Sequence, residues 1–138
     1  MADLLVNRDN DVLTLTLNRP DVMNALSEDM KQGLIREFQT EMAAPSVRAI
    51  LITGSGRGFC TGADLDLTTI LDRRPLIEGQ VKAGVNQLIK LMRDIPIPVV
   101  AAVNGAAAGA GFSLALASDF ILAAQSAKFH LSFAKIGA

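Results

Sequence analysis

The sequence predicts an α/β domain, because short apolar strands alternate with helices and two glycine-rich turns follow two of those strands. In residues 12–17 leucine alternates with threonine, which is the pattern of a strand with one buried face. In residues 30–42 a large apolar side chain recurs at every fourth position, which indicates an amphipathic helix. These patterns together predict a layered fold of helices on a sheet.

The N-terminal third begins with a predicted hairpin. Residues 4–8 and 12–17 are its strands, and Asn18-Arg19-Pro20-Asp21 ends the second of them. Ser27 is a good N-cap for the helix that follows, since Glu28 and Asp29 place negative charge in its first turn. This helix is expected to end near Pro45.

The rest of the chain continues the alternation. Residues 49–52 are apolar on both faces, which is typical of a parallel strand that is covered on both sides. An apolar stripe at helical spacing runs from 76 to 93. The remaining predicted elements are a strand at 99–103, a helix ending at Ala117, and strands at 120–124 and 127–132. We expect one domain over residues 1–138, with right-handed crossovers.

Composition excludes several classes of function. Half of the 138 residues are apolar, which is ample for a core. The 13 basic and 14 acidic residues nearly cancel and form no basic patch, and the chain has no Trp or Tyr, so no nucleic-acid partner is expected. One His and one Cys cannot supply a ligand set, so no metal site is expected.

The lone cysteine, Cys60, excludes an internal disulfide, and with no signal peptide visible a cytoplasmic protein is expected. We expect Cys60 to be a buried small apolar residue rather than a reactive thiol. The apolar segment 95–117 contains prolines and glycines, which favour a strand, a turn and a buried helix over a membrane span. No membrane partner is therefore expected.

Two glycine-rich turns are the most informative feature for function. The first runs from Gly54 to Asp64 and the second from Gly105 to Gly111, and each is expected to open a helix. Such turns point bare backbone N–H groups at open space, and two that converge on one oxygen make an oxyanion hole. Neither turn has the spacing of a nucleotide-binding signature. The spacing alone leaves helix–strand packing and ligand binding equally open.

Several segments carry a family resemblance, in order and at fitting separations. They are Asn18-Arg-Pro20, Asn24-Ala-Leu26, Gly58-Phe-Cys-Thr-Gly-Ala-Asp-Leu65, Val103-Asn-Gly-Ala-Ala-Ala-Gly-Ala-Gly111, Ser118-Asp119 and Ser126-Ala-Lys-Phe129. Together they resemble the enoyl-CoA hydratase/isomerase (crotonase) superfamily. The resemblance implies a crotonase-like ββα spiral. It also implies that residues 1–138 form the N-terminal portion, an acyl-CoA-binding core without the C-terminal part of the family domain.

The resemblance implies roles for particular residues. The N–H groups of Ala63 and Ala110 match the two oxyanion-hole donors that hold a thioester carbonyl and stabilise the enolate formed from it. The positions that match substrate contacts are Met23, Ala25, Gly62, Asp64, Leu65, Gly109, Gly111, Ser113 and Phe133. Coenzyme A enters as part of the substrate, so no separate cofactor is implied. Asp66 stands where many members carry a basic residue, so phosphate contacts from that position are not implied.

The resemblance also bears on the reaction. Hydratases of the family use two glutamates, and here Ser113 and Phe133 occupy those positions, which disfavours hydration. The segment from Phe133 to Gly137 instead resembles isomerase members, both Δ3,Δ2-enoyl-CoA isomerases and the ring-epoxide isomerases of phenylacetate degradation. In that group one carboxylate moves the proton, and its position would lie just beyond Ala138. The acid/base residue is therefore not expected within this chain.

Alternative interpretations remain open at this point. The chain could be hydratase-like, an aspartate-dependent acyl-CoA hydrolase or dehalogenase, or a non-catalytic CoA-binding remnant. Asp64 and Asp119 are better explained as capping or turn residues, and His130 has no obvious acidic partner that would make it a base. Phe112 and Phe133 could line an acyl pocket or fill the core, and the core is the default expectation. At full length the resemblance implies a homotrimer or a dimer of trimers.

Overall fold

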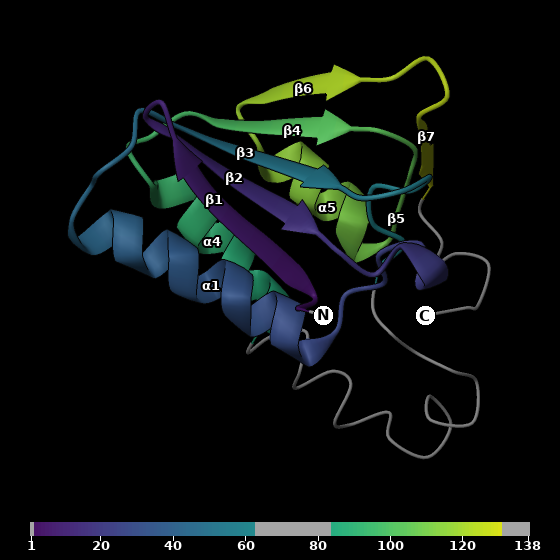
Figure 1. Ribbon diagram of the computed structural model, residues 1–138, viewed down its shortest axis with the longest axis horizontal. Coiled ribbons are helices and arrows are strands. Elements are labelled where there is room, and N and C mark those ends of the chain that lie inside the picture. The colour runs from purple at the N-terminus through teal and green to yellow at the C-terminus, as the bar shows by residue number, and fades with distance from the viewer. Residues whose placement is uncertain (1, 63–83, 131–138) are drawn as a thin grey trace.

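A five-stranded sheet forms the centre of the computed structural model, which describes residues 2–62 and 84–130 (Figure 1). Its strands, in spatial order, are β1 (Leu4–Asp9), β2 (Val12–Leu17), β3 (Ala49–Gly54), β4 (Val99–Val103) and β6 (Phe120–Ala123). β1 is antiparallel to β2, and the pairs β2–β3, β3–β4 and β4–β6 are parallel. The predicted hairpin and the predicted parallel strands are confirmed.

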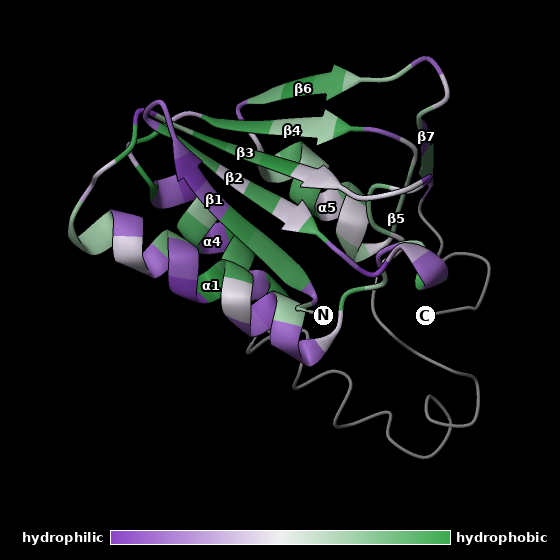
Figure 2. Cartoon of the chain, in the orientation of Figure 1, coloured by the Kyte–Doolittle hydropathy of each residue, from purple (hydrophilic) through white to green (hydrophobic). Residues whose placement is uncertain are grey.

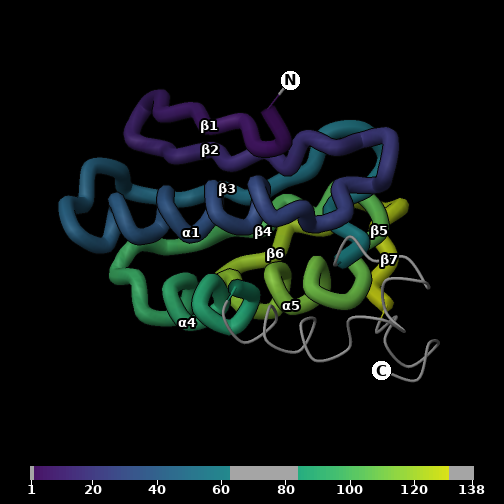
Figure 3. The backbone as a smooth tube through the Cα atoms, turned by 90° about the horizontal axis from the view of Figure 1, so that it is seen from below, coloured from purple at the N-terminus to yellow at the C-terminus, as the bar shows by residue number. Residues whose placement is uncertain are grey.

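The helices α1 (Glu28–Ala43), α4 (Asn86–Asp94) and α5 (Ala110–Ala117) lie on one face of the sheet (Figure 3). The predicted cap of α1 is confirmed, since the Ser27 hydroxyl oxygen accepts a hydrogen bond of 3.1 Å from the Met30 amide. Leu34 and Phe38 continue the predicted stripe and are fully buried. A single apolar cluster joins all three helices to the sheet, because each buries apolar side chains against the same strand face.

Burial alternates along the central strands. Ile50 and Ile52 are fully buried, whereas Leu51 between them is only half-buried, so the expectation of a strand covered on both faces is wrong. The reason is that the described helices all pack on the other face of the sheet. At the edge, Phe120 and Leu122 of β6 are 63% and 65% exposed, and Figure 2 shows β6 as an apolar strand.

A second, two-stranded sheet lies beyond the end of β4. It pairs β5 (Ala106–Ala108) with β7 (Lys128–His130) in parallel. The prediction that the second glycine turn passes directly into a helix is wrong, since β5 intervenes before α5 begins. The predicted last strand is confirmed over the described residues. The helix expected after the first turn and the first part of the stripe at 76–93 fall in residues 63–83, outside the described residues.

A buried carboxylate ties α1 to its neighbours. Glu41 is fully buried and accepts hydrogen bonds from the amide and hydroxyl of Ser46 at 2.8 and 2.7 Å and from the Val47 amide at 3.2 Å. The Arg8 guanidinium on β1 donates to it at 3.1 and 3.2 Å. Burial alone would raise the pKa of Glu41, but the Ser46, Arg8 and Val47 donors together hold that pKa below its ordinary value.

We expect acid to weaken the fold through Glu41. A carboxylate whose pKa is lower in the folded state contributes stability above its unfolded pKa of about 4.3, and this contribution is lost as the pH falls through the folded pKa. Glu41→Gln should lower the free energy of unfolding by about 2 kcal/mol at pH 7 and by less in acid. Urea denaturation of both proteins at several pH values measures this difference. Asp94→Asn at the exposed end of α4 is the control. A constant difference between the parent and Glu41→Gln across pH would contradict the prediction.

Candidate functional site

The candidate site lies at the carboxyl edge of the parallel strands. There the loop after β2, the first glycine turn after β3 and the second glycine turn after β4 come together (Figure 1). In open α/β sheets this edge is where ligands bind. The site residues expected from the sequence belong to these three segments and to the start of α5, apart from the residues that the structure does not describe.

The two glycine turns pack backbone against backbone. The amides of Phe59 and Cys60 donate to the Ala106 carbonyl at 3.0 and 3.2 Å, and the Ala108 amide donates to the Cys60 carbonyl at 3.0 Å. A Cβ on Gly105 would overlap the Arg57 carbonyl oxygen. These contacts explain why glycine occupies that position, so packing accounts for part of the glycine content.

The amide of Ala110 stands at the point where the turns meet. Ala110 is the first residue of α5, where a helix leaves its N–H groups without an intrahelical partner. Ala110 is buried, and its amide donates no hydrogen bond to any acceptor in residues 2–62 or 84–130. Gly109 before it has φ 55° and ψ −124°, a conformation suited to glycine. A buried N–H group without an acceptor, such as that of Ala110, can donate a hydrogen bond to an anionic oxygen of a ligand.

The first turn ends beside this amide. Gly62 is buried with φ +98°, and a Cβ placed on it would lie 3.4 Å from the Ala110 nitrogen and 3.1 Å from the Ala108 carbonyl oxygen. A side chain here would therefore crowd the space in front of Ala110. The next predicted donor, Ala63, lies outside the described residues, as do Asp64, Leu65 and Phe133.

The loop after β2 borders the first turn, as predicted for Met23 and Ala25. The Met23 carbonyl accepts from the Thr61 hydroxyl at 3.2 Å, and the Leu26 amide donates to the Gly62 carbonyl at 2.6 Å. Ala25 is buried next to them, and its carbonyl accepts from the Arg19 guanidinium at 2.8 Å. The structure thus brings Met23, Ala25, Gly62, Gly109, Ala110 and Gly111 into one neighbourhood.

Ser113 lies one turn along α5 from that neighbourhood. Its amide donates to the Gly109 carbonyl at 3.1 Å, its hydroxyl lies 3.5 Å from the same oxygen, and the residue is exposed. A serine hydroxyl without a basic partner does not remove protons at neutral pH. Ser113 can therefore contribute a hydrogen bond but not general-base chemistry.

Cys60 and Asp119 have structural roles. Burial raises the pKa of the Cys60 thiol to about 11, so the residue is an uncharged, fully buried thiol, as expected, and not a nucleophile. The Asp119 carboxylate accepts from the Val99 amide at 2.8 Å and fixes the start of β4, at the opposite end of that strand from the glycine turn. The expected turn role of Asp119 is confirmed.

His130 and Phe112 lie near the end of the second turn. The His130 carbonyl on β7 accepts from the Gly109 amide at 3.1 Å, and its side chain is exposed. Phe112 was expected in the core, which is wrong: it is half-buried, with its ring 5.4 Å from that of Phe129 on β7. The Phe112 ring packs against the exposed Phe129 ring and is not part of the central apolar cluster.

Residues 7–138 match the family model described as enoyl-CoA hydratase/isomerase. The chain belongs to that family. It is 39% identical over 139 residues to 1,2-epoxyphenylacetyl-CoA isomerase of Escherichia coli (strain K12), covering 99% of this chain and 53% of that protein. It is 36% identical over 144 residues to 2,3-dehydroadipyl-CoA hydratase of the same organism, covering 99% and 52%.

A solved structure of an enoyl-CoA hydratase from Mycobacterium smegmatis superposes with a TM-score of 0.88 at 35% identity, covering 99% of this chain and 53% of that one. The chain therefore has part of a crotonase fold, as the resemblance implied, and it spans about half the length of the relatives it matches. An isomerase and a hydratase are similarly close, so the comparisons establish the family and not the reaction.

Sequence reasoning missed two residues of this crotonase-family site. Asn24 and Asn104 both donate from their side-chain amides to the Gly58 carbonyl, at 2.8 and 3.0 Å. A signal was present, because each asparagine lies in a loop that directly follows a strand and Asn104 precedes a glycine. That pattern predicts a turn, but it does not reveal which distant carbonyl the side chain reaches.

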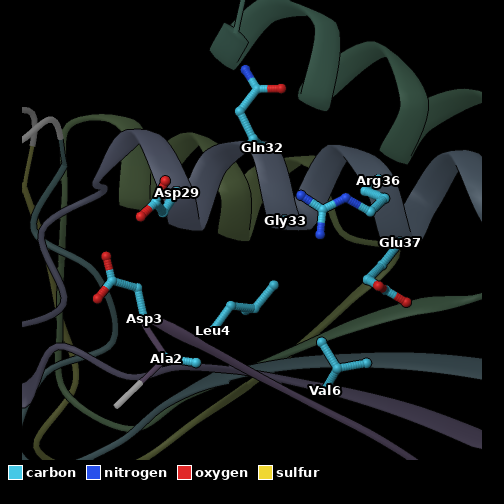
Figure 4. A pocket seen from close by; sticks show the side chains of 9 residues that line it. All are labelled: Ala2, Asp3, Leu4, Val6, Asp29, Gln32, Gly33, Arg36 and Glu37. Atoms are coloured by element: carbon cyan, nitrogen blue, oxygen red, sulfur yellow. The ribbon is translucent and has the colours of Figure 1, made fainter.

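A cavity of about 320 Å³ lies elsewhere in this crotonase-family chain, between β1 and the first half of α1 (Figure 4). Its lining residues are Ala2, Asp3, Leu4, Val6, Asp29, Gln32, Gly33, Arg36 and Glu37. None of them belongs to the glycine turns. Three of these side chains, Asp3, Asp29 and Glu37, are acidic and one, Arg36, is basic, so the excess of negative charge suits neither a thioester enolate nor the phosphates of coenzyme A.

In residues 2–62 and 84–130 no helix has the length and apolar character that a bilayer crossing requires. The same residues contain no group of three or more His, Cys, Asp or Glu side chains placed to hold a metal ion.

Proposed function

We propose that this chain provides the thioester-binding part of an acyl-CoA isomerase that works through an enolate. The observation that carries the proposal is the open, buried amide of Ala110 at the first position of α5, beside Gly62 at the end of the first turn. The amide of Ala63, the next residue, is the proposed second donor. Two such donors, with the positive end of a helix behind one of them, favour a negatively charged oxygen.

The proposed reaction moves one double bond and one proton. A base removes a proton from the carbon between the thioester and the double bond, and the electron pair passes onto the thioester oxygen between Ala63 and Ala110. Returning a proton to the far carbon of the resulting dienolate restores the carbonyl and leaves the double bond conjugated with it. The chain's own contribution is to hold the oxygen, and one such donor is worth about 3–4 kcal/mol of barrier.

Isomerisation is favoured over hydration by the residues at two positions. Hydration needs two carboxylates around the substrate, and the resemblance places Ser113 and Phe133 there. Ser113 is exposed and hydrogen-bonded only to the Gly109 carbonyl within the described residues. A single acid/base is enough for isomerisation. We propose that this group lies outside the chain, as the family resemblance implies for isomerase members.

Coenzyme A is proposed to bind along the loop after β2. Met23 and Ala25 border the first turn through the contacts of Thr61 and Leu26, so an acyl-CoA could run from the loop to the Ala110 amide. Asp64 and Leu65 would extend the same wall. The substrate is then an acyl-CoA thioester, with no cofactor besides it.

A non-catalytic CoA-binding role is the second candidate. The observation that favours it is that no Asp or Glu side chain in residues 2–62 or 84–130 belongs to the turns around Ala110. The described carboxylates lie on β1 and α1, in their flanking loops, at the end of α4 and before β6. An assembly with three-fold symmetry and a cytoplasmic location are further proposals, which follow from the family alone.

Incubating the purified chain with a 3-enoyl-CoA, with and without added imidazole as an external base, tests the proposed function. We expect binding, and conjugation of the double bond that imidazole accelerates, followed by ultraviolet absorbance. A 2-enoyl-CoA should not be hydrated under the same conditions. Binding without conjugation would favour the non-catalytic role, hydration would favour a hydratase, and no binding of either thioester would contradict the whole proposal.

A further inference from the structure

We propose that Asn24 and Asn104 are positioning residues, which fix the first glycine turn against the second and thereby set the position of Gly62 relative to the Ala110 amide. This inference deepens the proposed function and rests on it. The described part of the chain shows both side chains bound to one carbonyl, that of Gly58, four residues before Gly62.

Asn104 joins the two turns directly. It follows β4, and its side chain reaches the first turn at three backbone atoms. Its Oδ1 accepts from the Gly54 amide at 3.2 Å, and its Nδ2 donates to the carbonyls of Gly56 and Gly58 at 3.1 and 3.0 Å. One side chain therefore fixes both ends of the five-residue stretch 54–58 relative to the end of β4.

Asn24 holds the same stretch from the other side. It is fully buried in the loop after β2 and has φ +57°, a left-handed conformation that asparagine tolerates better than most residues. Its Oδ1 accepts from the Arg19 amide at 2.7 Å, and its Nδ2 donates to the carbonyls of Ser55 and Gly58 at 2.9 and 2.8 Å. The first turn is thus bound on both flanks by primary amides.

The four-residue path from Gly58 to Gly62 connects the asparagine contacts to the Ala110 amide. From Gly58 the chain runs to Cys60, whose amide and carbonyl both bind β5, and then to Gly62 beside Ala110. Figure 3 shows the segment after β3 lying next to β5. Because Cys60 is hydrogen-bonded on both sides, a displacement of Gly58 is expected to displace Gly62 as well. A misplacement of about 1 Å in such a site can lower a rate 100-fold.

Only a primary amide can make these contacts. Each side chain uses one oxygen as acceptor and one nitrogen as donor to two carbonyls, a combination that no other side chain of this size offers. Aspartate keeps the shape but sets a charged oxygen against the Gly58 carbonyl, which repels it and moves the turn. Asn→Asp is therefore the most informative substitution, because the side-chain volume stays nearly constant while the two N–H donors of the amide are lost.

The test measures the stretching frequency of the carbonyl group in a bound thioester. An acyl-CoA labelled with carbon-13 at the thioester carbonyl is bound to the chain, and difference infrared spectroscopy reports the stretching frequency, which falls as the donors tighten on the oxygen. We expect a clear downward shift in the parent. In Asn104→Asp and Asn24→Asp we expect a frequency close to that in water and acyl-CoA affinity reduced about tenfold, a loss of 1.4 kcal/mol.

Controls separate positioning from general stability. Asn7→Asp makes the same chemical change on exposed β1 and should leave the carbonyl shift at the parent value. Asn104→Ser, which keeps one hydroxyl donor and admits water, is a milder variant and should give an intermediate shift. Circular dichroism shows that each variant is folded at the temperature of the measurement, and affinity for coenzyme A without an acyl group should change less than affinity for acyl-CoA.

The outcomes distinguish the two proposals. No carbonyl shift in the parent with acyl-CoA bound would overturn the proposed function itself. A parent shift that persists unchanged in folded Asn104→Ser and Asn24→Asp would overturn the positioning role and leave the proposed function intact. Equal losses of affinity for acyl-CoA and for free coenzyme A would also overturn it, since that result indicates a merely structural effect.

Discussion

Replacing Ala110 with proline is expected to abolish thioester activation while leaving the chain folded. Proline lacks the N–H group that the proposed site uses, and its ring would fill the space in front of the nitrogen. The first position of a helix tolerates proline, because its N–H has no intrahelical partner there. Gly109 lies in the mirror image of the extended conformation that precedes proline, which glycine can hold. The backbone conformation at residues 109 and 110 therefore accepts proline.

The measurement is exchange of the substrate's acidic protons for deuterium in the presence of imidazole, followed by nuclear magnetic resonance. Loss of one oxyanion donor should slow this exchange on the bound thioester roughly 100- to 1,000-fold. Ala110→Gly is the matched control, since it changes the side chain and keeps the amide. If Ala110→Pro exchanged protons at the parent rate, the Ala110 amide could not be a donor to the thioester oxygen.

Local patterns were sufficient for most of the fold. The leucine–threonine alternation placed β2, the four-residue apolar spacing placed α1, and Ser27 marked its first turn; all three signals depend on neighbours in sequence. The pattern failed where burial depends on distant parts of the chain. Leu51 has an apolar neighbour on each side in sequence, but its exposure depends on what packs over that face of the sheet.

The candidate site was predictable only in outline. Glycine at 62, 105 and 111 signals close approach of backbone, but not which backbone approaches. The answer depends on pairing between residues about fifty positions apart, such as Cys60 with Ala107, which no local pattern encodes. The short strand β5 was missed for the same reason, since three alanines favour helix until a partner strand binds them. The role of Asn104 could not be predicted for the same reason, because its hydrogen-bond partner Gly56 is 48 residues away in the sequence, in the first glycine turn.

Gly111→Ala should destabilise the whole domain. A Cβ on Gly111 would overlap the Cys60 carbonyl oxygen and lie 2.7 Å from its carbon, and both atoms are backbone, so no side-chain rotation relieves the contact. Helix α5 must move away from the first turn, which strains the bond between the Ala108 amide and the Cys60 carbonyl. We expect the free energy of unfolding to fall by about 3 kcal/mol, measured by urea denaturation.

Gly33→Ala in α1 is the matched control for this substitution. Its Cβ would lie 3.0 Å from the Leu4 Cδ2 atom and at ordinary contact distances, 3.8 and 4.0 Å, from the Cβ and Cγ atoms of the same side chain, and the Cδ2 methyl group can rotate away. Alanine also favours the helix by about 1 kcal/mol, so the net change should be small. If Gly111→Ala were as stable as Gly33→Ala, the Cys60 carbonyl could not be in close contact with residue 111, and the prediction would be wrong.

The two substitutions in α5 together resolve what the glycine spacing left open. If the turns serve packing alone, Gly111→Ala destabilises the chain, and Ala110→Pro leaves the rate of proton exchange on the bound thioester unchanged. If they also bind a ligand, Ala110→Pro removes activation in a chain of nearly parent stability, while Gly111→Ala loses both. The geometry favours the second result, because packing explains Gly105 and Gly111 but gives the buried Ala110 amide no acceptor within the described residues.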